Sequence, residues 1–82
     1  MAAVDVLLFG PLADLAATPS VRLEVGNEAR VADILVKLRQ RFPAIGSRLD
    51  AAAVALNLSY VGRDALVKPG DEVALIPPVS GG

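Results

Sequence analysis

Apolar and polar residues alternate along this chain with two different periods, which predict where its strands and helices lie. Residues 4–9 are mostly apolar and end at Gly10-Pro11, which predicts a first strand closed by a turn. In residues 21–25 every second side chain is apolar and the others are charged, a pattern typical of a half-buried strand. We therefore expect these two strands to form an antiparallel pair with a long connection.

Spacings of three and four residues mark the main helix. Its apolar stripe consists of Val31, Ile34, Leu35, Leu38 and Phe42. Pro43 ends the pattern. Burial of five such side chains contributes about 7 to 15 kcal/mol before the loss of conformational entropy is subtracted, so the stripe is predicted to be core. A shorter helix is expected over residues 11–17, with Pro11 in its first turn.

The stretch that follows the main helix is less regular. We expect a short helical turn around residues 47–51, because its alanines favour a helix whereas Gly46 interrupts one. Residues 54–61 hold Asn57 between two apolar halves. Because Asn tolerates positive φ, this predicts a tight hairpin that turns at Asn57-Leu58. A single continuous strand is the alternative.

The last strand is predicted over residues 73–76, after a type II turn at Pro69-Gly70. The order of elements is then strand, strand, helix, short strands and strand. That order predicts an α+β domain in which one sheet packs on one main helix.

The first and last strands carry apolar side chains on both faces over residues 6–9 and 73–76. One set is expected to face the helix, namely Val6, Leu8, Val73 and Leu75. The other set is then expected to face outward, namely Leu7, Phe9, Ala74 and Ile76. This second set suits a docking surface; the alternatives are loops that cover it, or a small domain that tolerates some exposed apolar surface.

Composition excludes most kinds of catalytic site. The chain has 82 residues, enough for one domain, and contains no Cys and no His. This excludes a disulfide, a thiol nucleophile, an imidazole base and the usual kind of zinc site, so no metal is expected. A formal net charge of −1, with both signs scattered, gives no footprint for nucleic acid or an anionic membrane. The opening residues lack a basic region and a long apolar run, which predicts a cytoplasmic protein without an export signal.

The end of the sequence has a chemistry of its own. Its residues are Pro77, Pro78, Val79, Ser80, Gly81 and Gly82. The prolines predict an extended stem, and the glycines allow passage through a narrow channel and close approach to the terminal carbonyl. The Gly82 carboxylate, with a reference pKa of roughly 3.3 to 3.7, would need activation by a separate enzyme, as a mixed anhydride with AMP. A flexible, inert terminus is the alternative.

The string GDEVALIPPVSGG, which begins at Gly70, closely resembles the C-terminus of the small subunits of molybdopterin synthase. The segments FGPLADLA, RFP and ALNLSYV extend this resemblance over essentially the whole chain. That family belongs to the β-grasp, ubiquitin-like sulfur carriers. The resemblance implies a β-grasp domain over residues 1–76, with its first and last strands adjacent and parallel, and an extended reactive tail over residues 77–82.

The resemblance also implies a function as a sulfur carrier. In the family, an adenylating enzyme related to ubiquitin-activating enzymes uses ATP to join the terminal glycine, here Gly82, to AMP. A sulfur donor then converts the adenylate to a thiocarboxylate. The carrier docks on the large synthase subunit and donates its sulfur to cyclic pyranopterin monophosphate, in molybdenum cofactor biosynthesis. The chain itself is expected to bind no cofactor and to have no catalytic side chains.

Roles for individual residues follow from the same resemblance. The positions expected to lie in the partner's channel are Pro77, Pro78, Val79, Ser80 and Gly81, of which Gly81 gives clearance. The positions expected to dock on partners are Phe9, Tyr60 and Ile76. The alternatives are another Gly-Gly carrier of the same fold, serving thiamine or cysteine synthesis or protein tagging, and a β-grasp interaction module with an inert tail.

Overall fold

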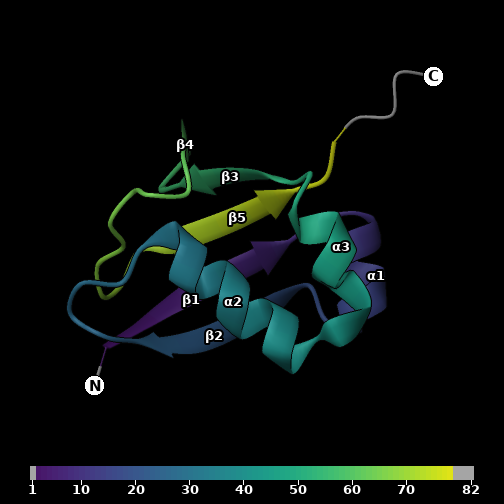
Figure 1. The fold of residues 1–82 in the computed structure, drawn as a ribbon, viewed down its shortest axis with the longest axis horizontal. Coiled ribbons are helices and arrows are strands. Elements are labelled where there is room, and N and C mark those ends of the chain that lie inside the picture. Colours follow the sequence, from purple (N-terminus) through teal and green to yellow (C-terminus); the bar gives the residue numbers. More distant parts are fainter. Residues whose placement is uncertain (1, 79–82) are drawn as a thin grey trace.

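A computed structural model describes residues 2–78 of the chain, which form a mixed five-stranded sheet with helices against one face (Figure 1). The strand order across the sheet is β2-β1-β5-β3-β4. The strands are β1 (Ala2–Leu8), β2 (Ser20–Val25), β3 (Ala53–Leu56), β4 (Ser59–Val61) and β5 (Glu72–Ile76). The predicted α+β architecture of the β-grasp type is confirmed.

The first and last strands form the parallel centre of the sheet, as predicted. Val6 of β1 is the partner of Val73 of β5, and β1 also pairs antiparallel with β2. On the other side of β5, strand β3 runs antiparallel to both β5 and β4. Because β1 and β5 run in the same direction, both finish at the same end of the sheet, where the tail leaves the domain (Figure 1).

The helices close one face and one end of the sheet. Their bounds are α1 (Pro11–Ala16), α2 (Val31–Arg41) and α3 (Gly46–Leu49), and a 3-10 turn (Pro43–Ile45) leads into α3. Helix α2 lies across the sheet, whereas α1 and α3 lie near the end where β1 and β5 finish (Figure 1). The start of α2 is fixed by the Asp33 carboxylate, which accepts the Arg30 N–H at 2.8 Å.

The core lies between α2 and the inner face of the sheet. Four members of the predicted stripe are at most 3% exposed: Val31, Ile34, Leu35 and Leu38. Phe42 follows the last residue of α2 and is half-buried. The predicted inward residues of the central strands, Val6, Leu8, Val73 and Leu75, are at most 2% exposed. The helix stripe and the inward faces of the strands are therefore confirmed as core.

Two local predictions have different outcomes. The hairpin at Asn57-Leu58 is confirmed, because β3 and β4 pair antiparallel around these residues, whose φ angles are 49° and 74°. The helical turn expected around residues 47–51 is present as α3, but it starts earlier than expected because Gly46 does not interrupt it. Gly46 has φ −52° and is the first residue of α3, and its N–H donates to the Pro43 carbonyl. The proline-led turn supplies the helical geometry that the glycine itself does not favour.

Candidate functional site

The face of the sheet opposite α2 carries a row of side chains that crosses every strand. Residues paired directly across the strands place Ser20, Leu7, Ala74, Ala55 and Tyr60 in one line from β2 to β4. Four of these five residues have apolar bodies, and Tyr60 at the far end is 73% exposed. The row therefore forms a continuous apolar strip on the face that the helices do not cover.

A second apolar row lies next to the tail. Ile76 is the Cα partner of Ala53 in β3, and Phe9 directly follows the last residue of β1. The Phe9 N–H donates to the Leu75 carbonyl at 3.4 Å, which continues the parallel pairing and brings Phe9 beside Ile76. Phe9 is 45% exposed, whereas Ile76 is half-buried.

We call these two rows together the outer apolar face; it consists of Leu7, Phe9, Ala53, Ala55, Tyr60, Ala74 and Ile76. All three predicted docking positions lie on it: Phe9 and Ile76 beside the tail, and Tyr60 on the edge strand β4. The sequence reasoning missed Ala53 and Ala55. No apolar and polar alternation marked them, because residues 53–56 are all apolar, and only the strand register shows that Val54 and Leu56 are the inward members of β3.

Charged residues border the outer apolar face at the end away from the tail. Asp5 and Arg22 form an ion pair at 3.2 Å, with side chains 55% and 75% exposed. Glu72 is the partner of Asp5 on the adjacent strand and is also exposed. An exposed pair of this kind contributes little to stability, so these residues mainly set the limit of the apolar surface.

The tail begins as part of the folded domain. Pro77 is half-buried and Pro78 is exposed. Gly10 lies close to Pro77, since a Cβ built on this glycine would lie 3.4 Å from Cγ of that proline. The predicted channel and reaction residues Val79, Ser80, Gly81 and Gly82 lie outside the described residues.

Charged side chains elsewhere support the fold. Arg63 donates to the carbonyls of Leu49 at 2.9 Å and Asp50 at 3.2 Å, and so satisfies backbone acceptors at the end of α3. The Asn57 amide and the Lys68 backbone N–H donate to the Asp71 carboxylate, and these hydrogen bonds hold its pKa below its ordinary value. Asp71 thereby joins the β3–β4 hairpin to the turn before β5.

The described part of the chain offers no enzyme-like constellation. Between residues 2 and 78 there is no group of three or more acidic side chains that could hold a metal ion, and no polar side chain is buried. None of the helices in this part of the chain is both long and apolar enough to cross a bilayer.

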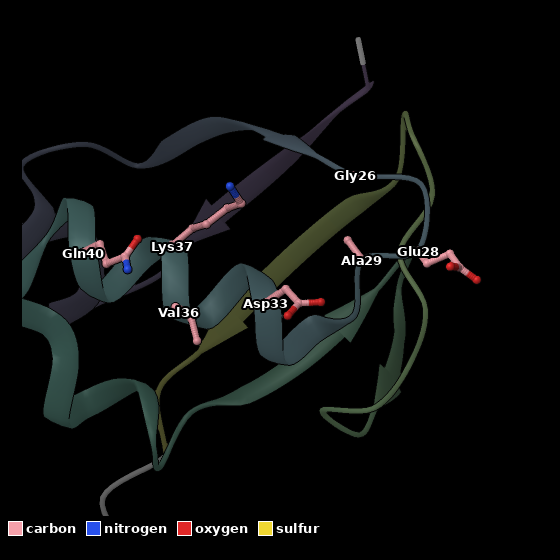
Figure 2. Close-up of a pocket in the computed structure, with 7 residues that line it drawn as sticks. All are labelled: Gly26, Glu28, Ala29, Asp33, Val36, Lys37 and Gln40. Atoms are coloured by element: carbon pink, nitrogen blue, oxygen red, sulfur yellow. The ribbon is translucent and has the colours of Figure 1, made fainter.

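A hollow of about 540 Å³ lies on the helical side of the molecule, away from the outer apolar face. It is lined by Gly26, Glu28, Ala29, Asp33, Val36, Lys37 and Gln40. Figure 2 shows these side chains pointing in different directions instead of converging on one point. Asp33 already serves the start of α2, and Glu28, Lys37 and Gln40 do not converge with it around a ligand.

The chain is similar to known proteins in both sequence and structure. Residues 6–82 match the model of the ThiS family. The molybdopterin synthase sulfur carrier subunit of Chlamydomonas reinhardtii is 38% identical over 82 residues, which cover 96% of this chain and 98% of that protein. The crystal structure of SAMP1 from Haloferax volcanii is 35% identical and superposes with a TM-score of 0.89, covering 98% of this chain and 99% of that one.

A structure of two proteins together is also similar. It is the complex of subunits 1 and 2 of the molybdopterin-converting factor from Helicobacter pylori, of which the matching chain is 25% identical. The TM-score is 0.73, with 98% of this chain and 99% of the other covered.

Proposed function

The chain belongs to the ThiS family, and from its similarity to molybdopterin synthase sulfur carrier subunits we propose that it is the sulfur carrier subunit of a molybdopterin synthase. One structural observation carries the proposal beyond the likeness of sequence. The parallel pairing of β1 and β5 places the start of the tail beside the outer apolar face. A carrier needs this arrangement, because each partner must bind the folded domain while it acts on the end of the chain.

The reactive group is the carboxylate of Gly82. A carboxylate oxygen attacks the α-phosphorus of ATP, pyrophosphate leaves, and the carboxylate becomes an acyl adenylate. A sulfide-level sulfur donor then attacks the acyl carbon, AMP leaves, and a thiocarboxylate remains. The sequence holds neither Cys nor His, so an adenylating enzyme supplies the ATP site and the groups that move protons.

The large synthase subunit is the partner in the second half of the cycle. The thiocarboxylate sulfur bonds to a carbon of cyclic pyranopterin monophosphate, and water then cleaves the acyl carbon–sulfur bond, so the sulfur stays on the pterin and the tail returns to the carboxylate form. A dithiolene contains two sulfur atoms, so two charged carriers are consumed for each product. Gly81 gives clearance within the partner's channel, since it has no Cβ. Support for this partner comes from the Helicobacter pylori complex, in which subunit 1 is bound to subunit 2.

The outer apolar face is the docking surface for both partners. Phe9 and Ile76 lie where the tail leaves, so a protein that covers them is placed to receive the tail, and Tyr60 offers a ring with a polar tip at the rim. The adenylating enzyme and the large subunit then compete for one surface. Release from the first partner must therefore precede binding to the second.

The cytoplasmic location stays a prediction.

A protein modifier is the second candidate function. It is favoured by the similarity to two crystal structures from Haloferax volcanii, one of SAMP1 and one of small archaeal modifier protein 1. The same acyl adenylate would then be attacked by a lysine amine of a target protein, and AMP would leave as an amide bond forms.

The two functions differ in the acceptor, and one experiment separates them. The thiocarboxylated chain is mixed with the large synthase subunit and cyclic pyranopterin monophosphate, and in parallel the carboxylate form is incubated with the adenylating enzyme, ATP and a protein that exposes lysines. We expect the dithiolene product only in the first mixture, in proportion to the thiocarboxylate consumed. The chain with an ordinary carboxylate serves as the control. Stable attachment to lysines in the second mixture, with no dithiolene in the first, would overturn the proposal.

A further inference from the structure

Gly10 joins β1 to α1 in a backbone conformation that other residues rarely adopt. Its φ is 55° and its ψ is −132°. An L-residue with a Cβ is strained at this combination, whereas glycine is not. The Gly10 carbonyl also accepts hydrogen bonds from the N–H groups of Ala13 at 3.1 Å and Asp14 at 3.4 Å, so its orientation starts α1. The glycine therefore fixes a sharp turn directly after Phe9.

This turn lies close to the first residue of the tail. A Cβ on Gly10 would approach Cγ of Pro77 to 3.4 Å, the near limit of ordinary van der Waals contact. Pro77 is half-buried, whereas Pro78 is exposed, so the contact with the domain ends after one residue of the stem. The Phe9–Leu75 hydrogen bond joins the ends of β1 and β5, from which Gly10 and Pro77 follow.

We propose that Gly10 is a positioning residue for sulfur transfer: its turn supports Pro77 and thereby sets the direction in which the reactive tail leaves the domain. The inference rests on the proposed function. Because proline fixes φ and two consecutive prolines form an extended segment, a change of direction at Pro77 is carried along the stem. The reactive end would then be displaced from the acceptor even when the body is docked correctly.

Two alanine variants test the proposal. Gly10→Ala forces the turn out of its present conformation and adds a methyl group at Pro77. Gly70→Ala is the matched control, because Gly70 also has a positive φ, 86°, but a Cβ there would meet nothing within 4 Å. Both variants should lose melting temperature, whereas only the first disturbs the support of the tail.

The kinetic experiment separates docking from positioning. Each thiocarboxylated variant is titrated with the large subunit, and the single-turnover rate of sulfur transfer is followed to saturation. For Gly10→Ala we expect the saturating rate to fall on the order of tenfold or more, with half-saturation within about threefold of the unsubstituted chain. Gly70→Ala should transfer sulfur at the normal saturating rate. Equal saturating rates for the two variants, or a loss of affinity alone, would overturn the proposal.

A second measurement does not depend on sulfur chemistry or on the folding of a variant. Nuclear Overhauser effects between the α-protons of Gly10 and the ring protons of Pro77 are measured in the unsubstituted chain. We expect them to be present, and their absence would overturn the proposal even if sulfur transfer is observed. Failure of the unsubstituted chain to transfer sulfur would instead overturn the proposed function, so the two failures are distinguishable.

Discussion

The backbone N–H of Phe9 donates a hydrogen bond to the carbonyl of Leu75 at 3.4 Å, one residue beyond the end of β1. This contact continues the parallel pairing and aligns Phe9 with Ile76 on the outer apolar face. The aromatic ring is thereby held at the point where the tail leaves the domain, although Phe9 itself is no longer in a strand.

Replacement of Phe9 by Glu tests the docking surface. The side chain is 45% exposed, so the free protein should lose less than about 1 kcal/mol of stability. On docking, the new carboxylate would be buried without a partner, and affinity for the large subunit should fall at least about thirtyfold, or about 2 kcal/mol. Thermal melting and titration are measured on the same samples.

Val36→Glu is the control for this experiment. Val36 is 47% exposed, nearly the same as Phe9, but it lies on α2 on the other side of the molecule. Its substitution should leave affinity unchanged. A large fall in melting temperature for Phe9→Glu would show that the ring belongs to the core. Equal affinities for the two variants would show that the partner docks elsewhere.

Leu58 occupies a turn position that favours glycine. Its φ is 74° and its side chain is 91% exposed, so it bears backbone strain without burying apolar area. We expect Leu58→Gly to raise the free energy of unfolding by about 0.5 to 1 kcal/mol, measured by chemical denaturation. Leu58→Ala removes the side chain but keeps the strain, so it should give no such gain. A less stable Leu58→Gly variant would contradict this interpretation of the turn.

Asp71 makes the stability of the hairpin depend on pH. Hydrogen bonds from Asn57 and from the Lys68 backbone hold the pKa of its carboxyl below the ordinary value of 3.8. A pKa lowered by folding contributes stability above the unfolded-state pKa, and this contribution is lost as the pH falls through the folded-state pKa. Asp71→Asn should therefore be less stable than the unsubstituted chain at pH 7, and the difference should shrink below about pH 4. Denaturant midpoints measured from pH 7 to pH 2 test this, and a constant difference would contradict it.

The sequence predicted the elements whose signals are local. The stripe on α2 and the alternation in β2 are direct consequences of helix and strand periodicity, and Asn57 marked the hairpin because it tolerates positive φ. The prediction for Gly46 failed because the preceding proline-led turn, and not the glycine, determines the backbone there. The helix propensity of Gly46 alone does not include the influence of the preceding turn.

The candidate site was predicted only in part, since it depends on contacts between distant segments. The outward residues of β1 and β5 could be predicted, because both odd and even positions of these strands are apolar. The alanines of β3 belong to the same face because of how β3 pairs with β5, and no sequence pattern gives that pairing by itself. Gly10 and Pro77 lie close together although most of the chain separates them in sequence. A Gly-Pro pair after a strand indicates a turn, but it does not indicate what the turn supports.

The mass of the intact chain tests the central proposal most directly. The chain is incubated with the cognate adenylating enzyme, ATP and a sulfur source, with the Chlamydomonas reinhardtii carrier as a positive control for the enzyme. We expect the mass to change by one exchange of oxygen for sulfur, located at Gly82 by fragmentation. A chain that lacks Gly82 should melt at the same temperature and remain unmodified. An unmodified full chain beside a modified control, or modification of the shortened chain, would contradict the assignment of Gly82 as the sulfur-bearing residue.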